Sequence, residues 1–339
     1  MRLSVLDQST ASRGKTQDLA IRETLALARH CDALGYHRYW VSEHHNSGNI
    51  VGTAPEILMS AIAATTPRIR IGSAGVMLPH YSAFKVAEQF RVLEAIAPGR
   101  IDLGLGRAPG SDRLTSLAIN PNPQDVHDQF PQQVQELRCW VTGTPLPDGH
   151  PFARVVAHPT GSSSPDMWML GSSDYGAQLG AYLGMPYAFA YFFSYGYDVD
   201  QALALYRKSY RPSERHPHPQ CTICVWALAA DTEAEALYQF KSRERAMLER
   251  EVGIRRPLMS PEEAAAHELS PREQAFVDNL RRNAVVGSIE QVKAKLDALA
   301  QRLDLDELVV VTWTYDPAPR MRSYELLAQA YALKGSPGV

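Results

Sequence analysis

Three short segments of the chain join an apolar, strand-like run to residues that can bind a ligand or transfer a proton. They are 39–46, which contains Glu43-His44-His45-Asn46, the glycine-rich segment 72–79, and 100–110, which contains Arg107. An imidazole exchanges protons near neutral pH, and a guanidinium offers a rigid fork of donors that fits a phosphate. These residue types predict acid–base chemistry beside a bound phosphate group.

The histidine pair lies where a predicted strand ends and a loop begins. Consecutive residues at such a point cannot all face one ion, and the zinc-protease spacing H-E-x-x-H is absent. The run therefore predicts no metal site. We expect one imidazole, that of His44, to face the site as a general acid or base. The alternative is that both histidines only form hydrogen bonds with the surrounding rim.

The segment 72–79 is rich in small residues but is not a phosphate-binding loop, because no G-x-x-x-x-G-K-[ST] run occurs in the chain. Ala74 and Gly75 follow directly after an apolar strand. Small residues at a strand end let a planar ring system approach the backbone closely, and they equally allow a neighbouring helix to pack tightly. Both interpretations remain open for this pair.

Arg107 lies in a glycine-containing run, 104–110, that differs from a dinucleotide-binding motif. The glycine spacing is wrong, and Pro109 stands where a phosphate-binding helix should begin. Arg107 itself ends a buried strand, where its guanidinium is suited to bind phosphate. The alternative is a structural salt bridge across the rim.

A second anion site is predicted where the run 170–176 leaves a strand and opens a helix. Backbone amides at a helix N-terminus, together with the hydroxyls of Ser172 and Ser173, can bind an anion, although a serine N-cap is an equally simple explanation. A phosphate held by this turn and Arg107, with a flat ring over Ala74 and Gly75 beside His44, describes a flavin mononucleotide (FMN) site.

Strands and helices alternate along almost the whole sequence, which predicts a parallel sheet. The predicted strands are 3–6, 39–42, 70–74, 101–105, 167–170, 187–190, 222–229 and 307–314, and the predicted helices are 16–34, 55–65, 82–97, 125–142, 173–183, 197–210 and 323–333. Eight such units predict an α/β fold, the (β/α)8 TIM barrel, as a single domain over 1–339. An open doubly wound sheet is the alternative.

The segment 232–287 interrupts this plan between strands seven and eight with a charged helical stretch. It is too long for an ordinary connection, and long insertions at a rim are often lids over the active site. A peripheral helical decoration is the alternative. We also expect an aromatic wall or a packed core edge from Tyr191, Phe192, Phe193 and Tyr195.

The composition is that of an ordinary globular enzyme, with 45% apolar and 21% charged residues among 339 and a net charge of −3. It suggests neither nucleic acid nor a membrane as a partner, and with no secretory pattern it predicts a cytoplasmic location. Cys221 and Cys224 form a C-x-x-C run, but side chains three apart on a strand face opposite sides, so we expect two ordinary buried thiols. Metal binding by His216 and His218 is not expected.

Segments 39–46, 72–79 and 98–104, with 284–288 near the end, are similar in sequence and in order to signatures of the bacterial luciferase-like, flavin-dependent monooxygenase family. The resemblance covers nearly the whole chain. It implies a (β/α)8 barrel, reduced FMN supplied by a separate flavin reductase, and molecular oxygen activated as a flavin hydroperoxide to oxidise a small organic substrate. The family often pairs its subunits, so the resemblance also implies a homodimer.

The resemblance assigns a role to each motif residue. His44 matches the catalytic histidine, Ala74-Gly75 a pair joined by a non-proline cis peptide beneath the flavin, and Arg107 the arginine that binds the phosphate. The residues that match the phosphate-binding turn are Ser172, Ser173, Tyr175 and Gly176.

One departure concerns light emission. True luciferases have a reactive cysteine immediately before the arginine, where this chain has Gly106, so a monooxygenase of other substrates is expected. Two rival functions share the same motifs. They are hydride transfer by a deazaflavin and non-catalytic binding of FMN.

Overall fold

A closed ring of eight parallel strands forms the centre of the computed structural model, which describes residues 1–108, 111–121, 126–194 and 196–335. Around the ring the order is β1, β2, β3, β4, β5, β6, β7 and β9, and β9 pairs again with β1. The bounds are β1 Arg2–Asp7, β2 Arg38–Val41, β3 Arg70–Met77, β4 Ile101–Gly106, β5 Asp166–Gly171, β6 Tyr187–Phe189, β7 Cys221–Ala230 and β9 Glu307–Val311. The fold is the predicted (β/α)8 TIM barrel.

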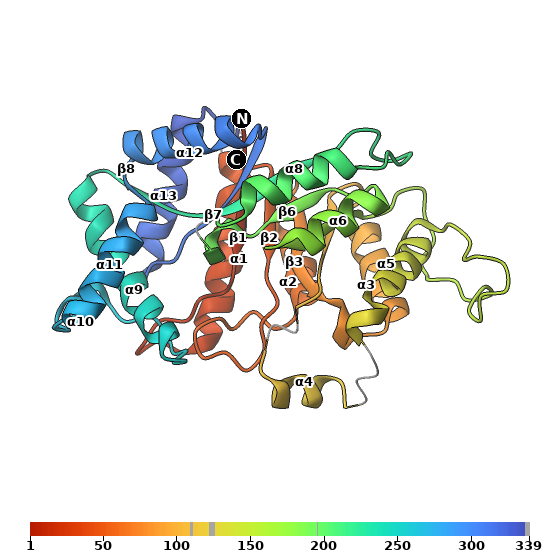
Figure 1. The fold of residues 1–339 in the computed structure, drawn as a ribbon, viewed down its shortest axis with the longest axis horizontal. Helices are drawn as coiled ribbons and strands as arrows, with labels where there is room; N and C mark the ends of the chain where they lie inside the picture. Colours follow the sequence, from red (N-terminus) through yellow and green to blue (C-terminus); the bar gives the residue numbers. More distant parts are fainter. Residues whose placement is uncertain (109–110, 122–125, 195, 336–339) are drawn as a thin grey trace.

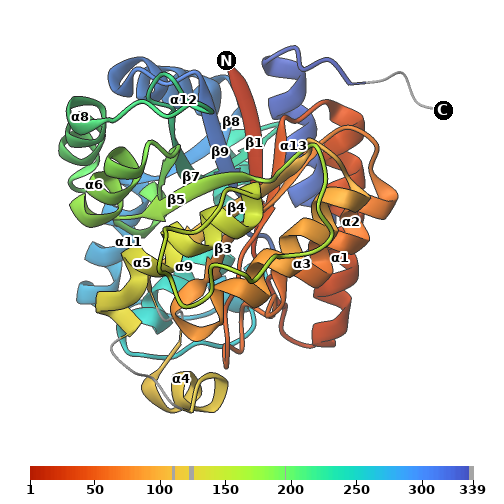
Figure 2. The same cartoon turned by 90° about the vertical axis from the view of Figure 1, so that its right-hand side faces the viewer.

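Helices surround the strands on the outside of the barrel (Figures 1 and 2). Their bounds are α1 Gln17–Leu34, α2 Pro55–Thr65, α3 Ala83–Ile96, α4 Arg113–Ile119, α5 Val126–Thr142, α6 Asp174–Leu183, α7 Tyr191–Ser194, α8 Val199–Ser209, α9 Glu233–Glu251, α10 Pro261–Ala265, α11 Pro271–Asn283, α12 Ile289–Leu303 and α13 Pro317–Ala330. None of these helices combines the length and the apolar composition that crossing a bilayer requires. The start of the predicted helix 125–142 lies outside the described residues.

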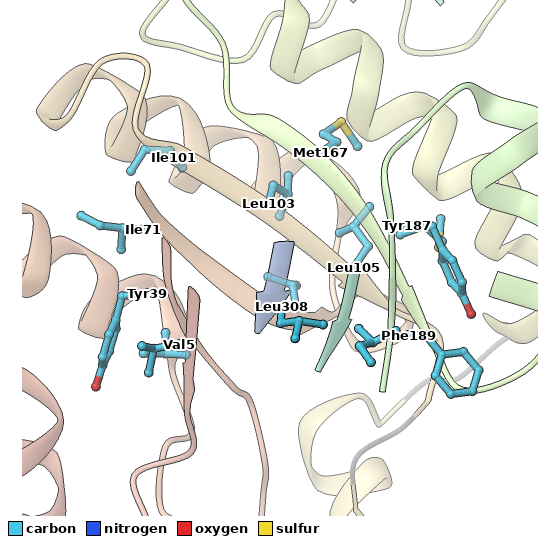
Figure 3. Packing of buried hydrophobic residues seen from close by; sticks show 14 of the residues in the cluster. Val5, Tyr39, Ile71, Ile101, Leu103, Leu105, Met167, Tyr187, Phe189 and Leu308 are labelled. Carbon is cyan, nitrogen blue, oxygen red and sulfur yellow. The ribbon is translucent and has the colours of Figure 1, made fainter. Parts of the chain in front are cut away.

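Apolar residues alternate between two sides of each strand, and this alternation builds the core. On β1 and β2, Val5 and Tyr39 belong to the cluster between the strands and the helices, whereas Leu6 and Trp40 belong to a second cluster that includes the barrel interior. Figure 3 shows the first cluster, with Val5, Tyr39 and Leu308 on neighbouring strands. The barrel is therefore packed on both faces of its strands, as parallel sheets usually are.

A buried ion-pair network lies near the N-terminal ends of the strands. The guanidinium of Arg38 on β2 bonds to Asp102 on β4 (Nη1–Oδ2 2.8 Å) and to Glu307 on β9 (Nε–Oε1 2.9 Å). Trp40 donates to the same Asp102 oxygen at 2.9 Å. Because all of these groups are buried, they hold β2, β4 and β9 together with charge-assisted hydrogen bonds.

Between β7 and β9 the chain forms α9, α10, α11, the short strand β8 (Val285–Ser288) and α12. Figure 1 shows α9, α10 and α11 grouped on one side of the barrel, and α9 contacts both α10 and α11. Strand β8 pairs with the end of β7 and is not among the strands that the sequence predicted. Movement of this segment as a lid stays a prediction.

The last helix begins earlier than predicted, at Pro317 rather than at Ser323. Pro317 is the first residue of α13, and there its missing N–H group costs no intrahelical hydrogen bond. The helix therefore starts in the segment that follows β9.

Candidate active site

A cavity of about 590 Å³, here called the inner cavity, opens at the C-terminal ends of the barrel strands. Strands β1 to β6 and the turns that follow them supply most of its walls, as expected for a TIM barrel. Its lining includes Leu6, Gln8, Trp40, Glu43, His44, Ala74, Gly75, Met77, Gly106, Arg107, Leu170, Ser172, Ser173, Tyr175, Gly176, Ala188, Phe192, Phe193 and Cys224. The eight residues that the sequence predicted for the site all lie in this set.

His44 follows β2 and lines the inner cavity. Its backbone N–H donates to the carbonyl of Gly52 at 3.0 Å, and its Nδ1 lies 3.2 Å from Oγ of Ser42. No described residue forms a hydrogen bond with Nε2. The ring is thus held on one side by Ser42, and its second nitrogen is available to a ligand.

The electrostatic surroundings keep the His44 imidazole neutral. Burial, then the positive charge of Arg255, lowers the pKa of His44 to about 4, although Glu43 opposes the shift. At neutral pH the ring therefore carries no charge. A neutral imidazole can accept a proton from a bound substrate or donate a hydrogen bond to it.

Glu43, which the sequence analysis did not select, organises the rim beside His44. Its carboxylate is buried and accepts hydrogen bonds from the backbone N–H of Met77 (3.0 Å) and from the hydroxyl of Tyr81 (2.6 Å). His45 Nε2 lies 2.7 Å from the same carboxylate. His45 therefore pairs with Glu43, and the two histidines have different environments. The only signal in the sequence was a carboxylate directly before two histidines.

Ala74 and Gly75 lie in β3, and the peptide bond between them is cis, as the resemblance implies. The pairing with β4 shifts register between Ser73 and Val76, on either side of this bond. A Cβ on Gly75 would lie 2.5 Å from Leu170 Cδ1 and 2.8 Å from the carbonyl oxygen of Gly104. Close packing against β4 and β5 therefore requires glycine here, while Ala74 lines the cavity.

Ser172 and Ser173 precede α6 and present free donors to the inner cavity. Ser173 is the N-cap residue, yet its side chain accepts no capping hydrogen bond, and neither hydroxyl has a partner among the described residues. The carboxylate of Asp174, in the first turn of α6, accepts a hydrogen bond from the side-chain amide of Gln201 (2.6 Å). Two unpaired hydroxyls at a helix N-terminus form a site suited to an anion.

Arg107 lies directly after β4, at the same end of the cavity. Its Cζ is 3.7 Å from the ring centroid of Tyr175, so the guanidinium stacks on the aromatic ring. Within the described part of the chain Arg107 has no carboxylate partner, and the alternative of a salt bridge across the rim is not observed. Pro109 and Gly110, which complete the motif, lie outside the described residues.

A second space of about 730 Å³, here called the outer chamber, adjoins the inner cavity. The two spaces share Gln8, His44, Phe192 and Phe193. Residues that line only the outer chamber include His45, Asn46, Asp112, Arg243, Met247, Glu249, Arg250, Arg255, Arg256 and Trp313. The sequence analysis did not identify this chamber, because its wall comes largely from α9 and the segment 253–256.

The predicted aromatic wall is formed in part. Phe192 and Phe193 line both spaces, and their ring centroids are 4.3 Å apart. Tyr191 packs against the core between strands and helices instead. Tyr195 lies outside the described residues.

The two cysteines of the C-x-x-C run are free thiols on β7, and their side chains lie on opposite faces of the strand. Cys224 lines the inner cavity, whereas Cys221 packs against the core outside the barrel. Burial raises the pKa of both thiols. Cys224 is buried, as predicted, whereas Cys221 is only partly buried. Of the two histidines at which metal binding was not expected, His216 lies with its Nε2 2.8 Å from a carboxylate oxygen of Asp166.

Comparison with known proteins gives the chain its family. The sequence profile described as luciferase-like monooxygenase matches residues 1–306. The chain belongs to the luciferase-like monooxygenase family. The protein of that name from Escherichia coli strain K12 is 38% identical, and the match covers 95% of each chain. The N-acetyl-S-alkylcysteine monooxygenase of Bacillus subtilis strain 168 is 34% identical over 97% of this chain and 98% of that protein.

Solved structures agree with this membership. The crystal structure of apo-MsnO8 has a TM-score of 0.89 and 34% identity, and covers 99% of this chain and 98% of its own. The oxygenating constituent of 3,6-diketocamphane monooxygenase, in complex with FMN, shares only the fold (19% identity, TM-score 0.70, 97% of each chain). An F420-dependent secondary alcohol dehydrogenase, in complex with an F420-acetone adduct, also shares only the fold. It is 15% identical with a TM-score of 0.64, and the match covers 96% of this chain and 97% of that one. Flavin and deazaflavin thus both occur in this fold.

Proposed function

We propose that this family member is an FMN-dependent monooxygenase that uses reduced FMN and molecular oxygen to oxidise a small organic substrate. The observation that carries the proposal is that His44, Ala74, Gly75, Arg107 and the turn 172–176 line one cavity. That cavity has an anion site at one end and a neutral imidazole elsewhere in its wall. A purely structural cavity would not need either feature.

The residues at the anion end fit the phosphate of FMN. The guanidinium of Arg107 and the unpaired hydroxyls of Ser172 and Ser173 can all donate to phosphate oxygens. Tyr175 holds the guanidinium by stacking, and Gly176 lies in the first turn of α6. We assign the wall at Ala74 and Gly75 to the flavin ring.

Reduced FMN, when bound, supplies the electrons that activate oxygen, so that one oxygen atom enters the substrate and the other leaves as water. His44 holds or accepts a proton at Nε2 during this reaction, because no described residue occupies that nitrogen of its neutral ring. The apolar walls at Trp40, Leu170 and Phe192 exclude water from the site. Ser42 keeps the ring oriented through Nδ1.

A separate flavin reductase is proposed as the source of reduced FMN, and a homodimer is proposed as the assembly. Both proposals rest on membership of the family. The 34% identical N-acetyl-S-alkylcysteine monooxygenase also supports placing S-alkylated N-acetylcysteines in the first substrate screen. Light scattering of the purified chain measures the assembly directly.

The test measures cofactor binding and oxygen use separately. Purified protein is titrated anaerobically with reduced FMN, reduced riboflavin and reduced F420, and oxygen uptake is then followed with N-acetyl-S-methylcysteine and other thioethers. We expect FMN to bind more tightly than riboflavin, and substrate-dependent uptake with ¹⁸O from ¹⁸O₂ in the product. Removal of one charged hydrogen bond by Arg107→Ala should weaken FMN about tenfold or more and leave riboflavin unchanged.

Arg138→Ala, a substitution on α5 away from the cavity, serves as the control and should leave FMN binding unchanged. Equal affinity for FMN and riboflavin would show that the phosphate is not recognised. Tight binding of reduced F420 with hydride transfer would favour the deazaflavin reaction. FMN binding without substrate-dependent oxygen uptake across the screen would favour a non-catalytic flavin carrier.

A further inference from the structure

The outer chamber is rich in positive charge, although the chain as a whole carries a net charge of −3. Four arginines line it, against two carboxylates, which belong to Asp112 and Glu249. The arginines are Arg243, Arg250, Arg255 and Arg256. The segment 243–256 therefore brings several guanidinium groups to one wall of a space that is continuous with the inner cavity.

The two carboxylates of the chamber are already engaged. Glu249 accepts from Arg256 (2.7 Å) and from Arg245 (2.9 Å). The carboxylate of Asp112 caps α4 by accepting a hydrogen bond from the backbone N–H of Thr115 (3.0 Å). It accepts a second hydrogen bond from the side-chain amide of Asn46. These contacts leave the acidic groups committed to local structure.

Arg250 and Arg255 have no such partner. Within the described residues neither guanidinium forms an ion pair or a hydrogen bond, and both side chains are exposed to the chamber. Arg250 lies beside Phe193, with its Cζ 5.7 Å from the ring centroid. Both charges act on His44, whose pKa they lower. They therefore lie near the imidazole to which we assign the proton chemistry.

The backbone around Arg255 is fixed against the barrel rim. Gly48 packs so closely on it that a Cβ there would lie 2.8 Å from the carbonyl oxygen of Arg255. Three residues further on, Leu258 exchanges backbone hydrogen bonds with Ala11 (2.9 Å) and Arg13 (2.7 Å). The backbone at Arg255 is thus held against the rim at Gly48 and, three residues later, at Ala11 and Arg13.

We propose that Arg250 and Arg255 bind the ionised head group of the substrate, which makes the substrate class of this site small organic acids. The inference rests on the proposed function, because it concerns the substrate of that same site. The apolar part of the acid lies against Phe192 and Phe193, the aromatic residues shared by both spaces. Its oxidisable atom enters the inner cavity beside His44.

The phosphate of FMN is the other anion that these arginines could attract. The inner cavity already offers it Arg107 and the turn 172–176, which lie after β4 and β5. Arg250 and Arg255 line only the outer chamber and come from the segment after β7. The two groups of donors are therefore assigned to two different anions, and this division can be tested.

The test uses phenylacetate as the anionic probe and phenylacetamide as its uncharged counterpart, with calorimetric titration of the full flavin-free chain. We expect phenylacetate to bind and phenylacetamide to bind at least tenfold more weakly. The affinity of the double variant R250Q/R255Q for phenylacetate should fall about tenfold or more, because two charge-assisted contacts are removed. Its affinity for FMN should be unchanged.

Two control variants locate the effect. Arg272→Gln removes the same charge from exposed α11 outside the chamber, and should leave phenylacetate binding unchanged. Arg107→Ala should weaken FMN and spare phenylacetate. Thermal unfolding of each variant confirms that the fold is intact.

The inference is overturned by any of three binding results: no saturable binding of phenylacetate, equal binding of the amide, or loss of phenylacetate binding in Arg107→Ala but not in R250Q/R255Q. These results differ from failure of the proposed function. Binding of phenylacetate through Arg250 and Arg255 without use of reduced FMN would support this inference and contradict the proposed monooxygenase function. Oxygen uptake with neutral thioethers but not with acids would overturn this inference and support the monooxygenase.

Discussion

At the scale of single residues, the charge state of His44 decides which proton chemistry the site can perform. Burial and the nearby Arg255 lower its pKa to about 4, so the neutral ring predominates near neutral pH. A neutral imidazole can accept a proton or donate a hydrogen bond, but it does not act as a general acid. The site therefore suits a reaction in which a proton is taken up at Nε2.

His44→Ala should lower turnover by about 10²–10⁴, the usual value of acid–base assistance, and leave FMN affinity nearly unchanged. Titration of the imidazole by NMR should show a pKa far below the ordinary 6.5. The pKa should rise in Arg255→Gln, because loss of a neighbouring positive charge favours the protonated ring. Arg272→Gln should not change it. Full activity of the alanine variant would exclude His44 from the reaction.

At the scale of elements, the strand ends could be predicted and the outer chamber could not. Apolar runs followed by polar or glycine residues mark β2, β3, β4 and β5, and in a parallel barrel these ends must meet at one rim. The chamber depends on how α9 packs after β7. On sequence alone its arginines were indistinguishable from a solvated charged face, because only the fold shows which side of α9 meets a cavity.

Short or unusual elements were missed for local reasons. Strand β8 has only four residues, Val285–Ser288, and one of them is Gly287, so its pattern was that of a loop. The free hydroxyl of Ser173 also could not be predicted, since an N-cap serine normally bonds to its own helix. Which of two adjacent histidines faces the cavity depended on the buried partner Glu43, and burial of that carboxylate follows from tertiary packing.

Contact between the rim loop at Gly48 and the segment at Arg255 can be tested by one substitution. In Gly48→Ala the new Cβ would overlap the carbonyl of Arg255, so the segment must move away from the rim. Limited digestion with trypsin should then cleave after Arg255 several-fold faster, because cleavage follows local opening. Cleavage after Arg215, in a loop remote from this contact, is the internal reference. An unchanged rate after Arg255 would show that the contact does not restrain the segment.

At the scale of the whole molecule, the buried network of Arg38, Asp102 and Glu307 joins strands that are far apart in the sequence. Without Arg38, Asp102 keeps its ion pair with Arg70, but buried Glu307 keeps only the Ser4 hydroxyl (2.6 Å) and a contact with Arg2 at 3.8 Å. Its charge is then poorly compensated. Arg38→Ala should therefore lower the free energy of unfolding by about 3–5 kcal/mol in a urea titration. Arg22→Ala breaks an exposed ion pair on α1 and should have little effect. Similar midpoints for the two variants would contradict a structural role for the network.

The two spaces of the site draw on different parts of the chain. Among the described residues, none between Asp231 and Gly287 lines the inner cavity, whereas α9 and the segment after it form a wall of the outer chamber. Under the proposed division of roles, we expect mutations in this segment to change substrate selectivity without disturbing the cavity assigned to FMN. The same division would let relatives differ in substrate while they keep one cofactor site. Exchange of this segment between relatives is a direct route to enzymes with altered substrate range.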